Sequence, residues 1–421
     1  MRVEILTIGD ELLLGFTIDT NAAHLARELA TVGVEVARRG TVGDAAGEIA
    51  AAVREALERT GAVITTGGLG PTADDLTKPA IAALFRRRMR LDGEYLEALR
   101  RRWRDRFGGE MPESNRQQAM IPEGATIVPN RHGSAPGIWL EDERARWVVM
   151  LPGVPRELRG MTGDELLPRL RERARSATEA TELPVVRSLT LRTTGIGESK
   201  LADLLGDDLG RGFSGGTLAY LPAFEGTDLR LTVRGLPDGA AVARLEEAAA
   251  RIRARLGAYV YGQDGGDLAA VVLDRCRARR LQVAAGESCT GGLFAARLTA
   301  ISGSSDVVLG GVVAYANDVK ERLLGVPAEL IAAHGAVSEE VARAMASGAR
   351  ARLGADIGVG ITGIAGPGGG SAEKPVGTVW TAMDLAGVVQ ARRAVYVGDR
   401  EEIRQRAAQG ALDMIRRALM D

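Results

Sequence analysis

Residues 286–292 are the part of this sequence best suited to covalent catalysis. They read Gly-Glu-Ser-Cys-Thr-Gly-Gly, and they follow an apolar run, 281–285, that predicts a buried strand. Residues 293–298 then predict a helix. A turn between a strand and a helix lies at the edge of a sheet, where the first amides of the helix can bind an anion or an oxyanion. Ser288 therefore stands where an exposed nucleophile would be expected.

A serine needs a base before it can act as a nucleophile. His334 lies in an Ala-Ala-His-Gly stretch that is typical of a helix end, which favours a structural role. The sequence Tyr-Ala-Asn-Asp-Val-Lys offers Lys320 instead, because a lysine that loses its hydration beside Tyr315 can act as a base. The three residues would form a serine–lysine centre. Spacing alone also allows a turn that only packs or binds a cofactor, and Cys289 is a rival nucleophile.

The turn, Gly303-Ser304-Ser305 and the stretch from Tyr315 to Lys320 together resemble the C-terminal amidase domain of the CinA family. The resemblance implies hydrolysis of the carboxamide of nicotinamide mononucleotide to nicotinate mononucleotide and ammonia, without a cofactor. Ser288 would be the nucleophile, Lys320 the base and Tyr315 its relay or orienter, with Ser305 completing the hydrogen-bond network. The amides of Cys289 and Thr290 would stabilise the oxyanion.

A second glycine-rich segment, residues 362–370, follows a strand predicted at 356–361. It could form a cradle of backbone amides for the nucleotide phosphate, or a flexible lid. Arg400, near the start of the last helix, could pair with the same phosphate. The substrate-binding residues expected in this domain are Glu287, Cys289, Thr290, Gly291, Gly292, Thr362, Gly363, Gly366 and Arg400.

The first part of the chain alternates short apolar runs with helical segments, which predicts a parallel, three-layer α/β domain. Its loop 65–77 combines glycines, hydroxyls and two adjacent aspartates before a helix. This composition predicts a phosphate cradle, and a metal ion between phosphate and carboxylates would explain the aspartates. One of the two could instead cap the helix. The expected binding residues are Gly67, Gly68, Gly70, Thr72, Asp74 and Thr77.

This loop resembles the molybdopterin-binding fold of the MoaB/MogA type, and it is closer still to the N-terminal domain of the CinA family. The closer match also includes residues 9–15, 19–21, 115–118 and 151–155. It implies an ADP-ribose pyrophosphatase that depends on a divalent metal (Mg, Mn or Co), helped by K. Asp75 would be catalytic, and the metal ligands would be Asp10, Glu11 and Asp75.

With 421 residues the chain is expected to form several domains. We predict a molybdopterin-binding-like α/β domain at 1–172, a small KH-like α+β domain at 180–258 and a three-layer α/β amidase domain at 265–421. Residues 176–183 are predicted as a linker and 262–266 as a hinge. The middle segment lacks the Gly-X-X-Gly loop of RNA-binding KH domains, so we expect a spacer or dimerisation element.

The charges are balanced, with 54 Lys and Arg against 55 Asp and Glu, which argues against direct binding of nucleic acid. Two cysteines and the absence of a long apolar run predict a cytoplasmic protein without membrane contact. The expected partners are small nucleotides and a second copy of the chain. Two rival functions stay open: a molybdopterin-binding protein with a regulatory C-terminal domain, and a non-catalytic binding protein for competence.

Overall fold

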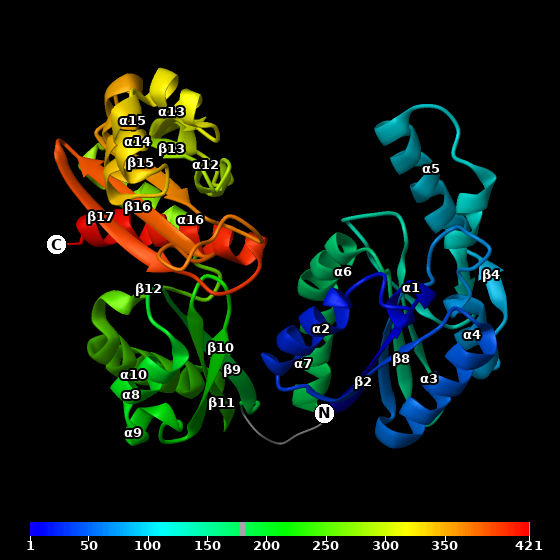
Figure 1. The fold of residues 1–421 in the computed structure, drawn as a ribbon. Helices are drawn as coiled ribbons and strands as arrows, with labels where there is room; N and C mark the ends of the chain where they lie inside the picture. The colour runs from blue at the N-terminus through cyan, green and yellow to red at the C-terminus, as the bar shows by residue number, and fades with distance from the viewer. Residues whose placement is uncertain (177–181, 421) are drawn as a thin grey trace. The chain divides into compact units, whose positions relative to one another are not determined.

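The computed structural model describes residues 1–176 and 182–420 and divides into two compact units (Figure 1). One unit contains Met1–Arg187 and Val233–Ala243, and the other contains Ser188–Thr232 and Arg244–Asp421. The linker predicted at 176–183 falls largely on residues 177–181, which lie outside the described residues.

The first unit is built on a six-stranded sheet in the order β2-β1-β3-β8-β7-β6. β1, β2, β3 and β8 are parallel, whereas β7 runs antiparallel to β8 and β6 antiparallel to β7. The prediction of a parallel sheet is therefore confirmed for four strands and wrong for β6 and β7. The turn at residues 142–146 is too short for the crossover that a parallel pair requires. The strands are β1 (Arg2–Ile8), β2 (Glu35–Val42), β3 (Ala62–Thr66), β6 (Thr126–Val128), β7 (Gly137–Glu141) and β8 (Trp147–Leu151).

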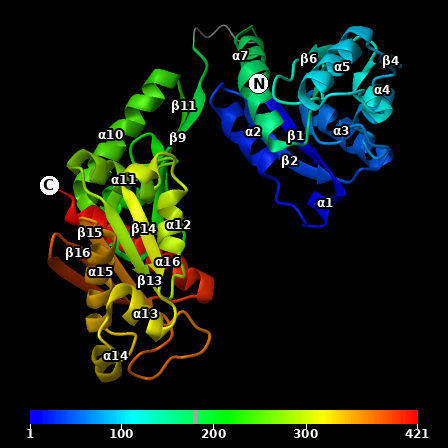
Figure 2. The same ribbon diagram turned by 90° about the horizontal axis from the view of Figure 1, so that it is seen from above.

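Helices bury both faces of this sheet, which confirms the three-layer prediction (Figure 2). α2, α6 and α7 pack on one face, and α3 and α4 pack on the other. α5 projects away from the sheet beside a two-stranded ribbon, β4 (Met89–Leu91) and β5 (Met120–Pro122). The helices are α1 (Asp10–Leu13), α2 (Thr20–Ala30), α3 (Ala46–Thr60), α4 (Thr77–Leu84), α5 (Gly93–Phe107), α6 (Pro155–Met161) and α7 (Leu167–Ser176), with short helical turns at Glu113–Ala119 and Thr162–Leu166.

The middle segment forms a small α+β module, as predicted, with one strand more than expected. Its sheet has the order β10-β11-β9-β12. Gly262 and Gln263, predicted as part of a hinge, lie in β12 and pair with β9. The elements are β9 (Val185–Thr193), α8 (Glu198–Leu205), α9 (Asp207–Gly210), β10 (Gly216–Pro222), β11 (Thr227–Leu236), α10 (Asp238–Leu256), a helical turn at Gly257–Tyr259 and β12 (Val260–Gln263).

The C-terminal segment is a second three-layer α/β domain, with sheet order β14-β13-β15-β16-β17. β13, β14 and β15 are parallel, and β16 and β17 continue the sheet antiparallel. α11, α12 and α16 cover one face, and α13 and α15 cover the other. The elements are α11 (Leu268–Arg279), β13 (Val283–Glu287), α12 (Leu293–Thr299), a helical turn at Ser304–Asp306, β14 (Val308–Val313), α13 (Asn317–Leu324), α14 (Ala328–His334), α15 (Glu339–Leu353), β15 (Ile357–Gly363), β16 (Thr378–Leu385), β17 (Val388–Val395) and α16 (Arg400–Ala418).

Two glycines let α15 lie unusually close to the central strand β15. A Cβ added to Gly358 would come within 2.0 Å of the carbonyl oxygen of Ala346, and one added to Gly360 within 2.2 Å of that of Ala342. No side chain fits at these distances, so the small residues bring helix and strand into backbone contact.

α16 joins the C-terminal domain to the middle module. Arg416, only 1% exposed, donates to the carbonyl oxygen of Ala258 and to the carboxylate of Asp413. Gln409 donates to the hydroxyl of Thr194 at 3.2 Å. The two segments therefore form one packed unit. In the described part of the chain, no helix is both long enough and apolar enough to cross a membrane.

Candidate functional site

The turn after β13 lies at the carboxyl edge of the C-terminal sheet. β13 ends at Glu287 and is flanked by β14 and β15, and the amide of Ser288 donates to the carbonyl oxygen of Ile361 at 2.8 Å. Ser288 is therefore held between the ends of three parallel strands. It is only 9% exposed, so it is more enclosed than the sequence pattern predicts.

Glu287 uses the helix amides that the sequence pattern assigns to a ligand. Its buried carboxylate accepts hydrogen bonds from the amides of Gly292, Phe294 and Ala295 at 3.1, 3.1 and 2.9 Å. These are the first amides of α12, which would otherwise have no partner. The prediction that Glu287 binds the substrate and that the helix start binds an anion was therefore wrong, because the two satisfy each other.

Two amides of the turn, those of Cys289 and Thr290, form no backbone hydrogen bond among the described residues and lie beside the Cys289 thiol. The amide of Gly291 donates to the carbonyl oxygen of Ser288. The guanidinium of Arg404 donates twice to the carbonyl oxygen of Thr290, at 2.9 and 3.3 Å, and so fixes the turn from α16. Gly291 and Gly292 have positive φ angles of 61° and 94°, so they shape the turn through their backbone.

Cys289 is buried, and burial raises the pKa of its thiol to about 12, although the amides of Cys289 and Thr290 oppose this shift. A thiol with this pKa is protonated at neutral pH and is a poor nucleophile. The geometry therefore favours Ser288 over Cys289. The other cysteine, Cys276, is also buried and free.

Lys320 lies in α13, and its side chain is 1% exposed. Its amine donates to the carbonyl oxygens of Ala314 and Tyr315 at 2.9 and 3.1 Å. Ala314 follows β14, and its amide donates a hydrogen bond to the carbonyl oxygen of Glu287 at 2.8 Å. Because Lys320 contacts Ala314, its amine lies at the sheet edge that carries Ser288. Burial lowers the pKa of Lys320, and the Cys289 thiol opposes the shift.

The phenol of Tyr315 has a different partner from the one predicted. The Tyr315 side chain is exposed, and its hydroxyl accepts a hydrogen bond from Arg400 at 2.7 Å. Arg400 also donates to the carbonyl oxygen of Gly366 at 2.7 Å. Tyr315 meets Lys320 only through its backbone carbonyl, so a proton relay through the phenol is not supported by these contacts.

Ser305 lies at the opposite edge of the sheet from Ser288. It belongs to the helical turn that precedes β14, and Val308 at the start of β14 pairs with Val283 at the start of β13. Five residues of β13, at about 3.3 Å each, separate the two edges by roughly 16 Å. The predicted role of Ser305 in the hydrogen-bond network was therefore wrong.

The glycine-rich segment after β15 returns to the same edge as Ser288. The hydroxyl of Thr362 is already used, since it donates to the carbonyl oxygen of Ala336 at 2.7 Å. Gly363 is the last residue of β15, and a Cβ there would meet the carbonyl oxygen of Thr378 at 2.7 Å. Lys374 donates to the carbonyl oxygen of His334, the last residue of α14, so the segment is tied to the domain.

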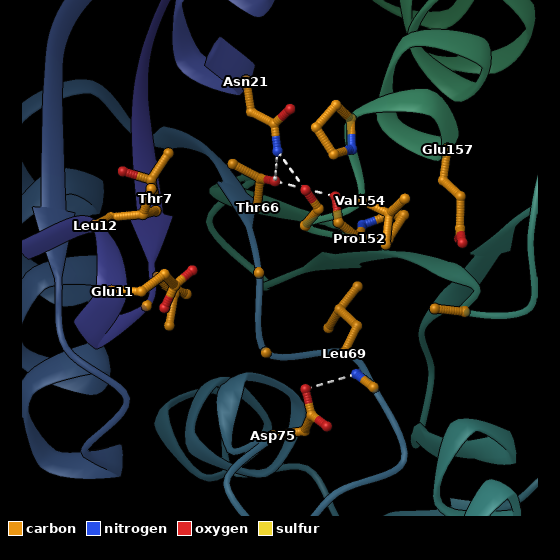
Figure 3. Close-up of a pocket in the computed structure, with 18 of the residues that line it drawn as sticks. Thr7, Glu11, Leu12, Asn21, Thr66, Leu69, Asp75, Pro152, Val154 and Glu157 are labelled. Atoms are coloured by element: carbon orange, nitrogen blue, oxygen red, sulfur yellow. Dashed lines mark hydrogen bonds between the residues drawn. The ribbon is translucent and has the colours of Figure 1, made fainter. Parts of the chain in front are cut away.

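The first unit contains a cavity of about 550 Å³ at the carboxyl ends of its parallel strands (Figure 3). The loop after β3 supplies Gly67, Gly68 and Gly70, which line it together with Asp74 and Asp75. A Cβ on Gly67 would lie 2.2 Å from the carbonyl oxygen of Ile8, so this position requires glycine.

Asp75 organises this loop. One carboxylate oxygen accepts the amide of Gly70 at 2.7 Å, and the other accepts the amide and the hydroxyl of Thr72 at 2.8 and 2.5 Å. Neither Asp74 nor Asp75 caps α4, because the residue before the helix is Leu76 and no side chain bonds its first turn. The capping alternative was therefore wrong.

Thr72 and Thr77 support the loop instead of facing the cavity. The hydroxyl of Thr77 is buried and donates to the carbonyl oxygen of Gly67 at 2.9 Å. Neither threonine lines the cavity, so their predicted role in substrate binding is replaced by a structural one. The Asp74 side chain is exposed.

The carboxylates predicted as metal ligands do not converge. Within residues 1–176 and 182–420, no group of three or more His, Cys, Asp or Glu side chains could hold a metal ion. The carboxylate of Asp10 accepts a hydrogen bond from the amide of Asp44, and the amide of Asp10 donates to the carboxylate of Asp44. The Glu11 side chain enters the cavity from α1, away from Asp75 (Figure 3). The residues present do not fit a metal held by Asp10, Glu11 and Asp75.

Two residues that line the cavity, and a buried lysine whose charge interacts with Asp75, escape the sequence pattern. Lys78 is 3% exposed, its amine donates to the carbonyl oxygen of Gln117 at 2.5 Å, and burial lowers its pKa to about 8 while Asp75 opposes the shift. Asn21 and Gln118 line the cavity, and the side-chain oxygen of each is buried with no partner among the described residues. Both belong to motifs of the resemblance, which was the available signal.

Comparison with family models assigns all three segments of the chain. Residues 4–172 match the model described as "Probable molybdopterin binding domain". Residues 188–262 match the "Damage-inducible protein CinA KH domain", and residues 266–419 match the "CinA C-terminal domain".

Curated relatives match over the whole length. A CinA-like protein of Gemmatimonas aurantiaca is 64% identical over 418 residues, which are 99% of this chain and 96% of that protein. One from Geobacter metallireducens is 44% identical, with both chains covered completely. A crystal structure of competence damage-inducible protein A from Klebsiella pneumoniae shares 38% identity with a TM-score of 0.36, over 36% of this chain and 94% of that one. The chain belongs to the CinA family.

Proposed function

We propose that the C-terminal domain hydrolyses the carboxamide of nicotinamide mononucleotide and that the N-terminal domain hydrolyses ADP-ribose. The observation that carries the amidase proposal is the environment of Lys320. A lysine that is 1% exposed, whose amine contacts carbonyl oxygens, and whose pKa is lowered by burial stands at the sheet edge that carries Ser288. A surface lysine in a salt bridge would have none of these properties.

The two carbonyl acceptors suit a neutral amine. A neutral amine has two N–H groups and one lone pair, and a protonated one has three N–H groups and no lone pair. The carbonyl oxygens of Ala314 and Tyr315 occupy two N–H groups. The lone pair is then free to take a proton, which a serine nucleophile requires of its base.

The proposed reaction runs through an acyl-enzyme. The Ser288 oxygen attacks the carboxamide carbon while Lys320 takes the hydroxyl proton. The amides of Cys289 and Thr290, which form no backbone hydrogen bond among the described residues, then stabilise the oxyanion, by about 3 kcal/mol per donor. Lys320 returns the proton to the leaving nitrogen, ammonia departs, and water hydrolyses the ester to release the carboxylate and Ser288.

Support for a nucleotide substrate in the N-terminal domain comes from the cavity lining. The unpaired oxygens of Asn21 and Gln118 are buried acceptors, and leaving such atoms without a donor costs free energy. Ribose hydroxyls or an adenine amino group would supply donors. The loop fixed by Asp75 presents its glycines to the same space, where a diphosphate would fit. No step is assigned to a metal, since the three predicted ligands do not converge.

The amidase proposal is tested by measuring ammonia release from nicotinamide mononucleotide with the full chain after treatment with a chelator. Turnover without added metal, and its loss in Ser288→Ala, would support the proposal. Turnover that persists in Ser288→Ala would remove the serine mechanism.

The match to a molybdopterin-binding model supports a second candidate for the N-terminal domain. Titration of ADP-ribose and of molybdopterin into the same protein separates the two. We expect ADP-ribose to bind and to be cleaved to AMP and ribose 5-phosphate. Tighter binding of molybdopterin, with no cleavage of ADP-ribose, would favour the second candidate.

A further inference from the structure

The first unit has a second cavity, of about 510 Å³, at the other edge of its sheet. Its walls come from α3, from the end of α4 and from the turn between β7 and β8. That turn precedes Trp147, which pairs with Ala62 at the amino end of β3. The first cavity lies at the carboxyl ends of the same strands, so the two are separate spaces.

Five arginines converge on this second cavity, against two carboxylates. Asp142 is already satisfied, since it pairs with Arg146 at 2.8 Å and accepts the amides of Arg144 and Arg146. The remaining arginines, Arg54, Arg86, Arg87 and Arg144, form no ion pair in the described part of the chain. Like charges around one hollow repel one another unless an anion lies between them.

The cavity also has an apolar side. Leu57 is buried, and Leu84 and Phe85 at the end of α4 are partly buried against the same core. A site for a bare inorganic ion would gain nothing from these side chains. A ligand with a ring attached to its phosphates would use both the charged and the apolar walls.

The backbone at Arg86 is fixed by the end of α4. α4 ends with the amide of Arg86 bonded to Ala83 and that of Arg87 bonded to Ala82, the pattern of a Schellman cap. Arg86 occupies the left-handed position of this cap, with φ of 56°, where glycine is the usual residue. Arg86 thus has a fixed backbone position at the edge of the cavity that it lines.

We propose that this cavity binds a nucleoside polyphosphate. Arg54, Arg86, Arg87 and Arg144 would bind its phosphates, and Phe85 and Leu84 would contact its base. A strand of nucleic acid is the less favoured ligand, because the site is a hollow and the whole chain carries a net charge of −1. The proposal is independent of the reactions proposed for the two domains.

The test measures binding of ATP to the full chain by calorimetry, with Arg86→Gly as the first variant. Removal of one phosphate-binding guanidinium should weaken ATP binding by about tenfold. The melting temperature should rise at the same time, because glycine relieves the strain at φ of 56°. A purely structural arginine would give the rise without the weaker binding, and that result would overturn the proposal.

Four further measurements complete the test. Arg144→Gln should also weaken ATP binding by about tenfold, and Arg101→Gln, an exposed arginine of α5 outside both cavities, should not. Equal weakening in both would mean diffuse electrostatic attraction. Unchanged binding in Arg144→Gln but loss in Asp75→Asn would place ATP in the first cavity. A short single-stranded oligonucleotide that binds more tightly than ATP would indicate a nucleic-acid surface. Each of these three outcomes would overturn the proposal.

Discussion

The loop at residues 67–77 and the turn at residues 286–292 follow parallel strands in two different domains, yet they are built alike. Each contains one carboxylate that accepts hydrogen bonds from backbone amides of its own segment, Asp75 in the first and Glu287 in the second. Each lies near a buried lysine whose amine donates to backbone carbonyls, Lys78 and Lys320. In both cases an internal carboxylate does what a bound anion would do.

The two regions differ in what the fixed segment presents. The N-terminal loop presents glycines to a large cavity that also contains unpaired amide oxygens. The C-terminal turn presents a buried serine and two amides that form no backbone hydrogen bond among the described residues. The comparison shows that the carboxylate sets the loop conformation, while the neighbouring residues decide the chemistry. The predictions below change one member of each pair.

The largest effect is expected from Lys320→Arg, which should reduce the amidase rate by about 1,000-fold or more, since arginine stays charged and cannot accept the proton. In the wild type, the rate should fall as the pH drops through the lowered pKa of Lys320, because only the neutral amine is a base. The midpoint should lie below 10.5, the ordinary value for lysine. A pH–rate profile of ammonia release measures both effects. Lys320→Ala at near wild-type rate would exclude this role.

Asp75→Asn should reduce ADP-ribose hydrolysis by about 100-fold. The NH2 group of the asparagine side chain would face the backbone N–H of Gly70 or of Thr72, and this contact between two donors would displace the loop. The amidase should be unaffected, since its residues lie in the other unit. Both reactions are measured on one preparation. A parallel loss of both, with the fold intact, would contradict the model of two separate sites.

Glu287→Gln should destabilise the C-terminal domain by about 2 kcal/mol. The buried carboxylate accepts hydrogen bonds from three amides, whereas a glutamine side chain has one acceptor oxygen and an NH2 group that only donates. Denaturant unfolding of the full chain measures the change. Glu329→Gln, an exposed glutamate of α14, is the matched control. Equal stability of the two variants would show that Glu287 does not hold α12.

Cys289→Ala should have the smallest effect, an amidase rate within about threefold of the wild type, because the buried thiol is protonated at neutral pH. The assay is again ammonia release. A loss of about a hundredfold here, with full activity in Ser288→Ala, would make Cys289 the nucleophile in place of Ser288.

Most of the fold could be predicted from the sequence because apolar runs and helical periodicity are local signals. The strands predicted at 281–285 and 356–361 and the helix predicted at 293–298 are examples, and they are present as β13, β15 and α12. The antiparallel edge of the first sheet and the strand β12 could not be predicted in the same way. Strand direction depends on the length of the connecting loop, as in the antiparallel pair of β7 and β8. Gly262 and Gln263 are residue types typical of a hinge, and they form a strand only because the edge of β9 is available for pairing.

The candidate sites were predicted less well than the fold. Ser288, Lys320 and the glycines of both loops lie where the motifs indicate. The side chains of Glu287 and Thr77 could form hydrogen bonds with a ligand or with the backbone, and the sequence does not distinguish the two. The structure shows that both bond to the backbone. Ser305 was misplaced because sequence proximity to β14 does not say which edge of the sheet a residue occupies.

The contacts of α16 have a consequence for synthesis of the chain. The first sheet and its helices are complete within residues 1–176, so this part can fold while the ribosome is still elongating the chain. The middle module cannot complete its packing at that stage, because Arg416 lies 158 residues after Ala258 and Gln409 lies 215 residues after Thr194. Its final assembly therefore waits until α16 has been made, although its own strands emerge much earlier.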